Sequence, residues 1–461
     1  MGKNSKNNAY LTGPIRRTMI RTAFAMLAGT IAMSGYNIAD TYFVGKLPGQ
    51  TPLAAIGFTF PIIMLLGCVF RGLATGLMTT SAQALGAGRS VRASTIVNSG
   101  LMMMLLFSLT LSLIGIWTGR MVLHSLGATG ETLEAAKEYM DIWFYGYLTA
   151  SIGATAGDMI VAIGESKLAA LGMFGALFLN IILDPMWIFG FGPIPALGIR
   201  GAAIATVISQ IAGMIYSLEI LRRRGLVQFR SIPWKLMGKA WILIIRFGIP
   251  AILGMLMIPI GSYVLTRITA EFGDAAVGGC QAAMKLESIA FMFPMSFGIS
   301  LTPMISQNFG ARQYQRIKQC MRFAMTFAFC LLLFMAVLFY LFAEPLVSLF
   351  TSEPEIKANM ILYMHIIPWS FWAIEVHRFS GFTFMGCGHP KFSAFLNIYR
   401  VLLLLIPFCL LALFFFRDYG ISCVLYARTF ADCIAAISAV FMANQMVRKL
   451  VRTGQQPFQK R

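Results

Sequence analysis

Residues 95–118 read TIVNSGLMMMLLFSLTLSLIGIWT, a run without any charged side chain. A helix needs roughly 20 mostly apolar residues to cross the hydrocarbon core of a bilayer. This stretch is long enough, and eleven others resemble it, so the pattern predicts an all-α membrane protein with twelve transmembrane helices. We place them at 18–44, 53–84, 95–118, 139–162, 168–191, 198–220, 240–268, 279–306, 323–350, 358–385, 394–416 and 420–447.

The composition supports this prediction. The chain has 461 residues, of which 58% are hydrophobic and 12% charged, whereas soluble domains carry about 25% charged residues. The eight cysteines lie mostly in apolar runs without any CxxC pair, so we interpret them as small core residues. The four histidines show no metal-ligand spacing, which argues against a membrane enzyme.

The basic residues alternate between the two predicted sides of the membrane. Most of the 37 Lys and Arg fall at the two ends of the chain and in alternate loops, with dense clusters in 222–239 and 312–322. Cytoplasmic loops carry such an excess, so we expect both termini in the cytoplasm and a multi-pass protein of the inner membrane. Membrane topology therefore already explains the net charge of +19, and we expect no nucleic-acid partner. The opposite loops hold only Lys46, Arg120, Lys137, Arg200, Arg267, Lys357 and Arg417.

The chain also repeats itself at an offset of about 224 residues. Segment 75–92, TGLMTTSAQALGAGRSVR, matches 299–316, ISLTPMISQNFGARQYQR, with Gln83 opposite Gln307. Each repeat holds six spans, so we expect two six-helix bundles related by a pseudo-two-fold axis along the membrane normal. Parallel repeats of this kind occur in transporters, with the substrate site between the halves. The predicted parts are an N-terminal lobe at 1–224, a cytoplasmic linker at 225–239 and a C-terminal lobe at 240–461.

Ionisable residues inside spans are costly and usually face a partner or a cavity. Acids of the second half have bases close by in sequence, and spacings of three or four residues favour structural ion pairs. The pairs are Lys285 near Glu287, Arg378 near Glu375, and Arg428 near Asp432.

In the first half, Asp40 and Asp184 have no basic residue within a helical turn. Two carboxylates in a low dielectric cannot both remain charged without a neutralising partner, so one takes a proton or a cation bridges them. Amide, hydroxyl and carbonyl oxygens are the donors that a small hard ion needs. The spacing places Tyr36 on the face of Asp40, Asn180 on that of Asp184, and Ala202 with Thr206. A purely structural hydrogen-bond cluster is the alternative.

Four segments resemble the multidrug and toxic compound extrusion (MATE) family, and the DinF-like branch in particular. They follow one another in family order, and the resemblance covers nearly the whole chain. The segments are IADTYFVGKLPGQTPLAAIG (38–57), LNIILDPMWIFGFG (179–192), GIRGAAIAT (198–206) and ISQNFGA (305–311).

The resemblance implies an antiporter of two six-helix lobes around a cleft, with Asp40 as the central coupling-ion carboxylate. It also implies that the site around Asp40 is formed by Tyr36, Asn180, Asp184, Thr206 and the Ala202 carbonyl. Na⁺ is a possible ion there, bound by Asp40, Asn180, Asp184 and Thr206. Glu375 falls where the NorM-like branch has a coupling acid. That branch's partner acid is missing from 250–260, PAILGMLMIPI, which argues against a NorM-type ion site.

One departure concerns the first helix, where DinF-like proteins often have a proline. This chain has Ala25 there, while the repeat keeps Pro250. A proline invites a kink, so the resemblance does not carry a bending mechanism of the first helix over to this chain.

We therefore predict a multidrug efflux antiporter that exports mainly cationic, aromatic compounds in exchange for H⁺ or Na⁺ by alternating access. It needs no cofactor, is not an enzyme, and works as a monomer in the bilayer. The alternative is a lipid or lipid-linked sugar flippase of the same superfamily, which basic residues in the spans keep open. The choice of ion, the natural substrate, the stoichiometry and the resting conformation stay open at this stage. Candidate side chains of the substrate cleft are Met33, Met173, Glu287 and Glu375, although core packing is the alternative role for the methionines.

Overall fold

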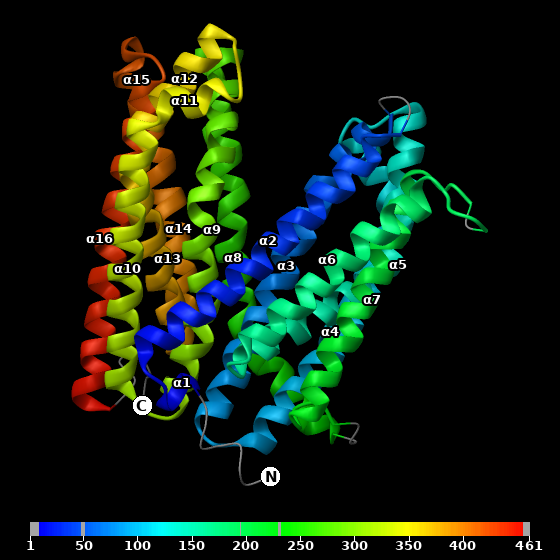
Figure 1. The fold of residues 1–461 in the computed structure, drawn as a ribbon. Helices are drawn as coiled ribbons and strands as arrows, with labels where there is room; N and C mark the ends of the chain where they lie inside the picture. Colours follow the sequence, from blue (N-terminus) through cyan, green and yellow to red (C-terminus); the bar gives the residue numbers. More distant parts are fainter. Residues whose placement is uncertain (1–8, 48–50, 194, 229–231, 455–461) are drawn as a thin grey trace. The chain divides into compact units, whose positions relative to one another are not determined.

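The structure of the chain, a computed structural model, describes residues 9–47, 51–193, 195–228 and 232–454. The side chains of residues 33, 34, 36–38, 40, 41, 52 and 53 lie outside what it describes. Nearly all of the described chain is helical (Figure 1). Lipid offers no hydrogen-bond partners, so a spanning segment must satisfy its backbone groups internally, as a helix does.

The first half of the chain forms six long helices after one short one. The short helix α1 is separated from α2 by Gly13 and Pro14. The helices are α1 (Ala9–Thr12), α2 (Ile15–Val44), α3 (Thr51–Gly86), α4 (Ser90–Ser125), α5 (Gly130–Ala162), α6 (Ser166–Ile188) and α7 (Ile199–Arg223).

The second half also makes six long passages, two of which are composite. A 3₁₀ turn joins α12 to α13, and a π-helical segment joins α14 to α15. The elements are α8 (Trp234–Thr269), η2 (Ala270–Phe272), α9 (Asp274–Gly310), α10 (Tyr314–Leu341), α11 (Ala343–Ser348), α12 (Pro354–Ile366), η3 (Ile367–Ser370), α13 (Phe371–Gly386), α14 (Pro390–Ile398), η4 (Tyr399–Leu405), α15 (Ile406–Phe415), η5 (Arg417–Tyr419) and α16 (Ser422–Thr453).

In the part of the chain that the structure describes, joining the composite passages gives twelve, so the predicted all-α architecture of twelve transmembrane helices in two halves is confirmed. Within the described ranges, nine helical segments are long and apolar enough to cross a membrane by length and composition alone. Two of the differences from the predicted spans coincide with prolines. The span expected at 323–350 ends at Leu341, and α11, which contains Pro345, follows separately. The span expected at 358–385 is interrupted at η3, where Pro368 cannot donate a backbone hydrogen bond.

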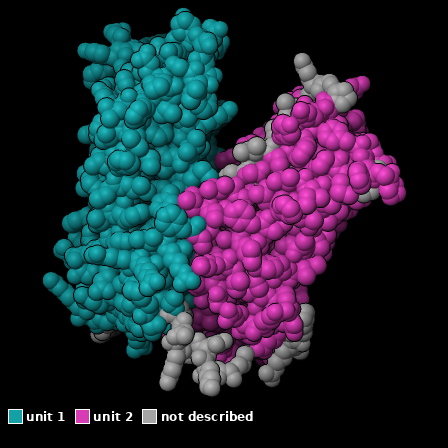
Figure 2. All heavy atoms as spheres, viewed as in Figure 1, with its two compact units in different colours: residues 1–24, 249–461 teal, residues 25–248 magenta. Residues whose placement is uncertain are grey.

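The chain forms two compact units, residues 25–248 and residues 1–24 with 249–461 (Figure 2). These packing units differ from the sequence repeats because the first part of each repeat's leading helix packs with the other repeat. Tyr10 and Met19 are buried with Phe297 of α9, and Trp241 of α8 donates its indole N–H to the carbonyl of Ser99 at 2.7 Å. The lobe bounds at 224 and 240 follow the repeat and stay a prediction.

Candidate coupling-ion site

Two polar residues of α6 are completely buried one helical turn apart. Asn180 and Asp184 both have no exposed surface, and the Nδ2 amide of Asn180 donates a hydrogen bond to Oδ1 of Asp184 at 3.0 Å. The neighbouring helix α7 packs along α6 and carries Ala202 and Thr206, which are also buried. A carboxylate, an amide and a hydroxyl therefore lie inside the unit formed by residues 25–248.

The end of α6 fixes these groups. Pro185 follows Asp184 inside the helix and has no N–H to donate to the preceding turn. The chain then closes back on itself, since the backbone N–H of Leu197 donates to the carbonyl of Trp187 at 3.0 Å. A Cβ on Gly201 would come within 2.1 Å of that same carbonyl oxygen, so only glycine allows α7 to begin this close to α6.

Helix α2 contacts α6 on both sides of Asp40. A Cβ on Gly35 would be in van der Waals contact with Leu177, and Val44 lies in one buried cluster with Ile188. These two contacts show that the helices run in the same direction. The backbone of Asp40 therefore lies level with the last turns of α6, where Asp184 is found.

The acids of the other unit are held differently, beginning with Glu287 on α9. Nη2 of Arg428 donates to both carboxylate oxygens of Glu287 at 3.0 and 3.1 Å, and Nη1 donates to the Tyr363 hydroxyl at 2.7 Å. The Tyr363 hydroxyl in turn donates to Glu287. Three elements, α9, α12 and α16, thus meet in one closed set of charge-assisted hydrogen bonds.

The ion pairs continue from this set. Asp432 accepts a hydrogen bond at 2.8 Å from Nε of Arg400, which lies on the π-helical segment η4, and its other oxygen is 3.9 Å from Arg428. Glu375 is fully buried and lies 3.0 Å from Nη1 of Arg378. Each buried acid of this network therefore has a guanidinium partner.

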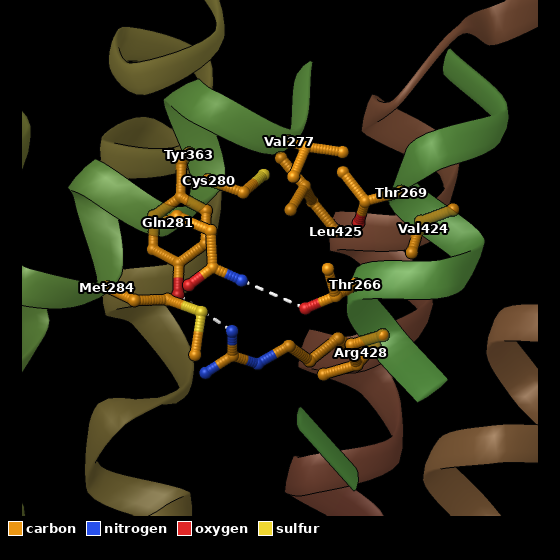
Figure 3. A pocket seen from close by; sticks show the side chains of 11 residues that line it. Thr266, Thr269, Val277, Cys280, Gln281, Met284, Tyr363, Val424, Leu425 and Arg428 are labelled. Carbon is orange, nitrogen blue, oxygen red and sulfur yellow. Dashed lines mark hydrogen bonds between the residues drawn. The ribbon is translucent and has the colours of Figure 1, made fainter. Parts of the chain in front are cut away.

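A small cavity of about 30 Å³ lies beside the network (Figure 3). Figure 3 shows the Arg428 guanidinium and the Tyr363 hydroxyl converging near Met284, while Gln281 donates to Oγ1 of Thr266 at 2.9 Å. This volume is about that of one water molecule. It suits water or a small ion and is far too small for an organic substrate.

A model of the MatE family matches residues 25–186 and, a second time, residues 250–411. The chain belongs to the MatE family. The two matches start 225 residues apart, at 25 and 250, which agrees with the predicted repeat offset of about 224. The family resemblance found in the sequence is thereby confirmed, and this MatE chain is a multi-pass membrane protein of a transporter family.

Similar proteins span almost the whole of this MatE chain. A FAD transporter of Shewanella oneidensis is 29% identical over 450 residues, covering 97% of this chain and 98% of that one. The multidrug export protein MepA of Staphylococcus haemolyticus is 24% identical and covers 95% of both chains. The crystal structure of the Vibrio cholerae MATE transporter VcmN in the bent form has a TM-score of 0.89 and 26% identity, covering 94% of this chain and 97% of that one.

The predicted ion-site residues of this MatE protein divide into two groups. Asn180, Asp184, Ala202 and Thr206 are buried on the adjacent helices α6 and α7. Tyr36 and Asp40 are in α2, as is the predicted cleft residue Met33, but the side chains of all three lie outside what the structure describes. The shared role of the six ion-site residues at a coupling site stays a prediction.

The predicted cleft residues Met173, Glu287 and Glu375 have clear contacts. The Met173 sulfur packs against Gly29 of α2, where a Cβ would come within 2.6 Å of it. Glu375 forms the ion pair with Arg378 that the three-residue spacing predicts. Glu287 instead binds Arg428, not its sequence neighbour Lys285, because residues two apart point to different sides of a helix.

Proposed function

We propose that this MatE transporter exports organic, mainly cationic and aromatic, compounds in exchange for H⁺ or Na⁺. The coupling ion is a transported species that binds at Asp40 and Asp184, with Tyr36, Asn180, Thr206 and the Ala202 carbonyl around it. The protein acts as a monomer in the inner membrane with both termini in the cytoplasm, and it uses no cofactor and has no enzymatic activity.

The completely buried Asn180–Asp184 pair carries this proposal. Burial removes a carboxylate from water, and a charged group inside a membrane protein is retained at a cost that usually reflects function. Asn180 donates one hydrogen bond to Asp184, and a neutral amide orients a carboxylate without adding a compensating charge. A proton or a sodium ion can cancel that charge reversibly.

The transport cycle follows from competition between the ion and the substrate. Ion binding from outside lowers the affinity for the exported compound, which leaves; the ion then leaves inward and a new compound binds. The two conformations must differ in their affinities, because a ligand with equal affinity for both shifts neither. An inward-moving charge at 100 mV supplies about 2.3 kcal/mol.

Ethidium efflux from proteoliposomes tests this proposal. An imposed H⁺ or Na⁺ gradient should drive efflux for the parent, and the effective gradient identifies the ion. The Asp40→Asn and Asp184→Asn variants should lose gradient-dependent efflux. The matched control is Asp141→Asn, an acid of α5 that forms an ion pair with Lys137, and it should transport like the parent. Full efflux by Asp40→Asn and Asp184→Asn would refute the coupling mechanism.

A second candidate substrate class is flavin dinucleotides, because the relative that covers 97% of this chain is a FAD transporter. FAD combines an aromatic ring with two phosphates, so it has the opposite charge from ethidium. Counterflow with each compound distinguishes the candidates: FAD transport without ethidium transport would favour the anionic class. Transport of neither, by folded and reconstituted protein, would favour the flippase alternative.

A further inference from the structure

A cavity of about 640 Å³ lies at one end of the unit formed by residues 25–248. Its wall consists of the turn after α3, the first turns of α4 and the first turns of α8. Three of its side chains are basic, and no acid is among the described residues that line it. The wall includes Arg89, Arg92 and Lys239 together with the apolar Val91, Leu236 and Leu243.

The equivalent place in the second repeat is closed. At the repeat offset, Arg92 corresponds to Arg316 of α10, which is bound on three sides. Its guanidinium donates to the carbonyls of Tyr10 at 3.2 Å and Gly13 at 2.8 Å, and to Oδ1 of Asn308 at 3.1 Å. There, Tyr10 of α1 is completely buried against the neighbouring helices.

One proline explains the difference between the two repeats. Pro14 has no N–H, so the Tyr10 carbonyl four residues earlier lacks its helical partner. Arg316 and the Asn308 amide, at 3.0 Å, satisfy that carbonyl instead. The counterpart of Pro14 is Gly238, inside the unbroken helix α8, which offers no spare carbonyl.

The basic side chains of the first repeat are therefore left available. The side chains of Arg89, Arg92 and Lys239 line the cavity, and they make no hydrogen bond or ion pair with any residue that the structure describes. Three neighbouring cations without an acid attract an anion, and the apolar residues beside them favour an anion that carries an apolar chain.

Two tryptophans of α8 indicate the depth of the cavity in the membrane. Trp234 is 70% exposed, and its ring lies 5.5 Å from that of Trp241. Tryptophan is enriched where a membrane protein crosses from hydrocarbon to water. Leu236, Lys239 and Leu243 lie on the same turns of α8, at the level where lipid headgroups are found.

We propose that this cavity binds one anionic phospholipid of the phosphatidylglycerol class. The phosphate diester lies between Arg89, Arg92 and Lys239, and an acyl chain follows Leu236 and Leu243. The site takes its lipid from the membrane leaflet on the side of the basic loops. In the second repeat, α1 and Arg316 fill the equivalent place.

Native mass spectrometry of the purified full chain, titrated with phosphatidylglycerol, tests the proposal. Each basic residue near an anionic lipid surface contributes roughly a factor of five in affinity, so Arg89→Gln/Arg92→Gln should bind roughly 30-fold more weakly. Lys239→Gln, on the other helix, should weaken binding roughly fivefold. It tests the same site independently should the double variant not fold. The matched control, Lys318→Gln/Arg322→Gln on α10, removes the same charge and should bind like the parent.

Two further competition measurements identify the ligand. Phosphatidylcholine should not compete with phosphatidylglycerol, and millimolar inorganic phosphate should not displace it, because the acyl chain contributes to binding. Equal losses in the site variants and in the α10 control would overturn the proposal in favour of diffuse attraction to the basic surface. Displacement by inorganic phosphate would overturn it in favour of a site for a free anion.

Discussion

The buried carboxyl groups of the two units differ in what holds them. In the unit of residues 25–248, Asp184 accepts a hydrogen bond at 3.0 Å from the neutral amide of Asn180. In the other unit, each buried or half-buried acid has a guanidinium beside it. The distances are 3.0 Å for Glu287 with Arg428, 3.0 Å for Glu375 with Arg378 and 2.8 Å for Asp432 with Arg400.

We interpret this difference as a division of roles between the polar residues of the two repeats. A guanidinium partner neutralises an acid permanently, and removing one member of such a pair is expensive. We propose that Asp184, which accepts a hydrogen bond from an amide, is an acid that a transported cation neutralises. We therefore expect mutations in one unit to reduce stability and in the other to reduce transport.

The largest effect should follow the loss of Arg428. Arg428→Met removes the donor of Glu287 and the neighbour of Asp432, so it should lower the free energy of unfolding by about 3–5 kcal/mol. Denaturation of the purified protein in detergent measures this loss. Arg428→Met/Glu287→Gln also removes the charge of Glu287, which Arg428→Met leaves without its partner, and should recover part of the lost free energy of unfolding. No recovery would mean that packing, rather than charge, dominates.

A clean separation of transport from stability should follow the change of one atom in Asp184. Asp184→Asn keeps the size of the side chain and should unfold near the parent, yet gradient-driven efflux should fall at least tenfold, a loss of roughly 1.4 kcal/mol or more in coupling. Asp432→Asn should show the reverse pattern, since it leaves Arg400 without its carboxylate. If both variants behave alike, the two units do not differ as we describe.

A smaller effect should come from the hydroxyl that completes the Glu287 cluster. Tyr363→Phe removes one hydrogen bond donated to Glu287 and one accepted from Arg428. Loss of such a buried group should cost about 1–3 kcal/mol. Thermal unfolding checks this value, and Tyr340→Phe, at a half-exposed ring elsewhere in the same unit, is the control that should change little.

The smallest effect concerns the turns that precede α4 and α10. Gly88 has a φ of 70°, and its repeat counterpart Arg312 has a φ of 58°, a region that costs other residues roughly 1–2 kcal/mol. Arg312→Gly should therefore raise the free energy of unfolding by up to about 1 kcal/mol, whereas Gly88→Ala should lower it. A destabilised Arg312→Gly would show that the Arg312 side chain makes a contact worth more than the backbone strain.

The twelve spans could be predicted because each rests on the length of one apolar run, which is a local property. The breaks inside spans could not. Pro368 indicates where η3 interrupts a helix, and Pro407 lies just after the segment Tyr399–Leu405, but the sequence does not show that this segment is π-helical. The packing of α1 and the first part of α8 with the other repeat also depends on contacts between distant segments.

The candidate site shows the same limit. Spacing along one helix correctly predicts the pairs Glu375–Arg378 and Arg428–Asp432, because residues three or four apart share a face. Partners on other helices carry no such pattern, so the sequence predicts neither the contact of Tyr363 with Glu287 nor that of Arg400 with Asp432. The Asn180–Asp184 hydrogen bond follows from spacing, whereas the grouping with Asp40 rests on the family resemblance.

Ion release on substrate binding tests the central claim most directly. Purified protein in weakly buffered detergent solution receives ethidium, and a pH indicator or a sodium electrode records what it releases. We expect the parent to release H⁺ or Na⁺ in proportion to the ethidium bound, Asp432→Asn to do the same if it is folded, and Asp184→Asn to release neither. Equal release by the parent and Asp184→Asn would contradict the assignment of the coupling site to this unit.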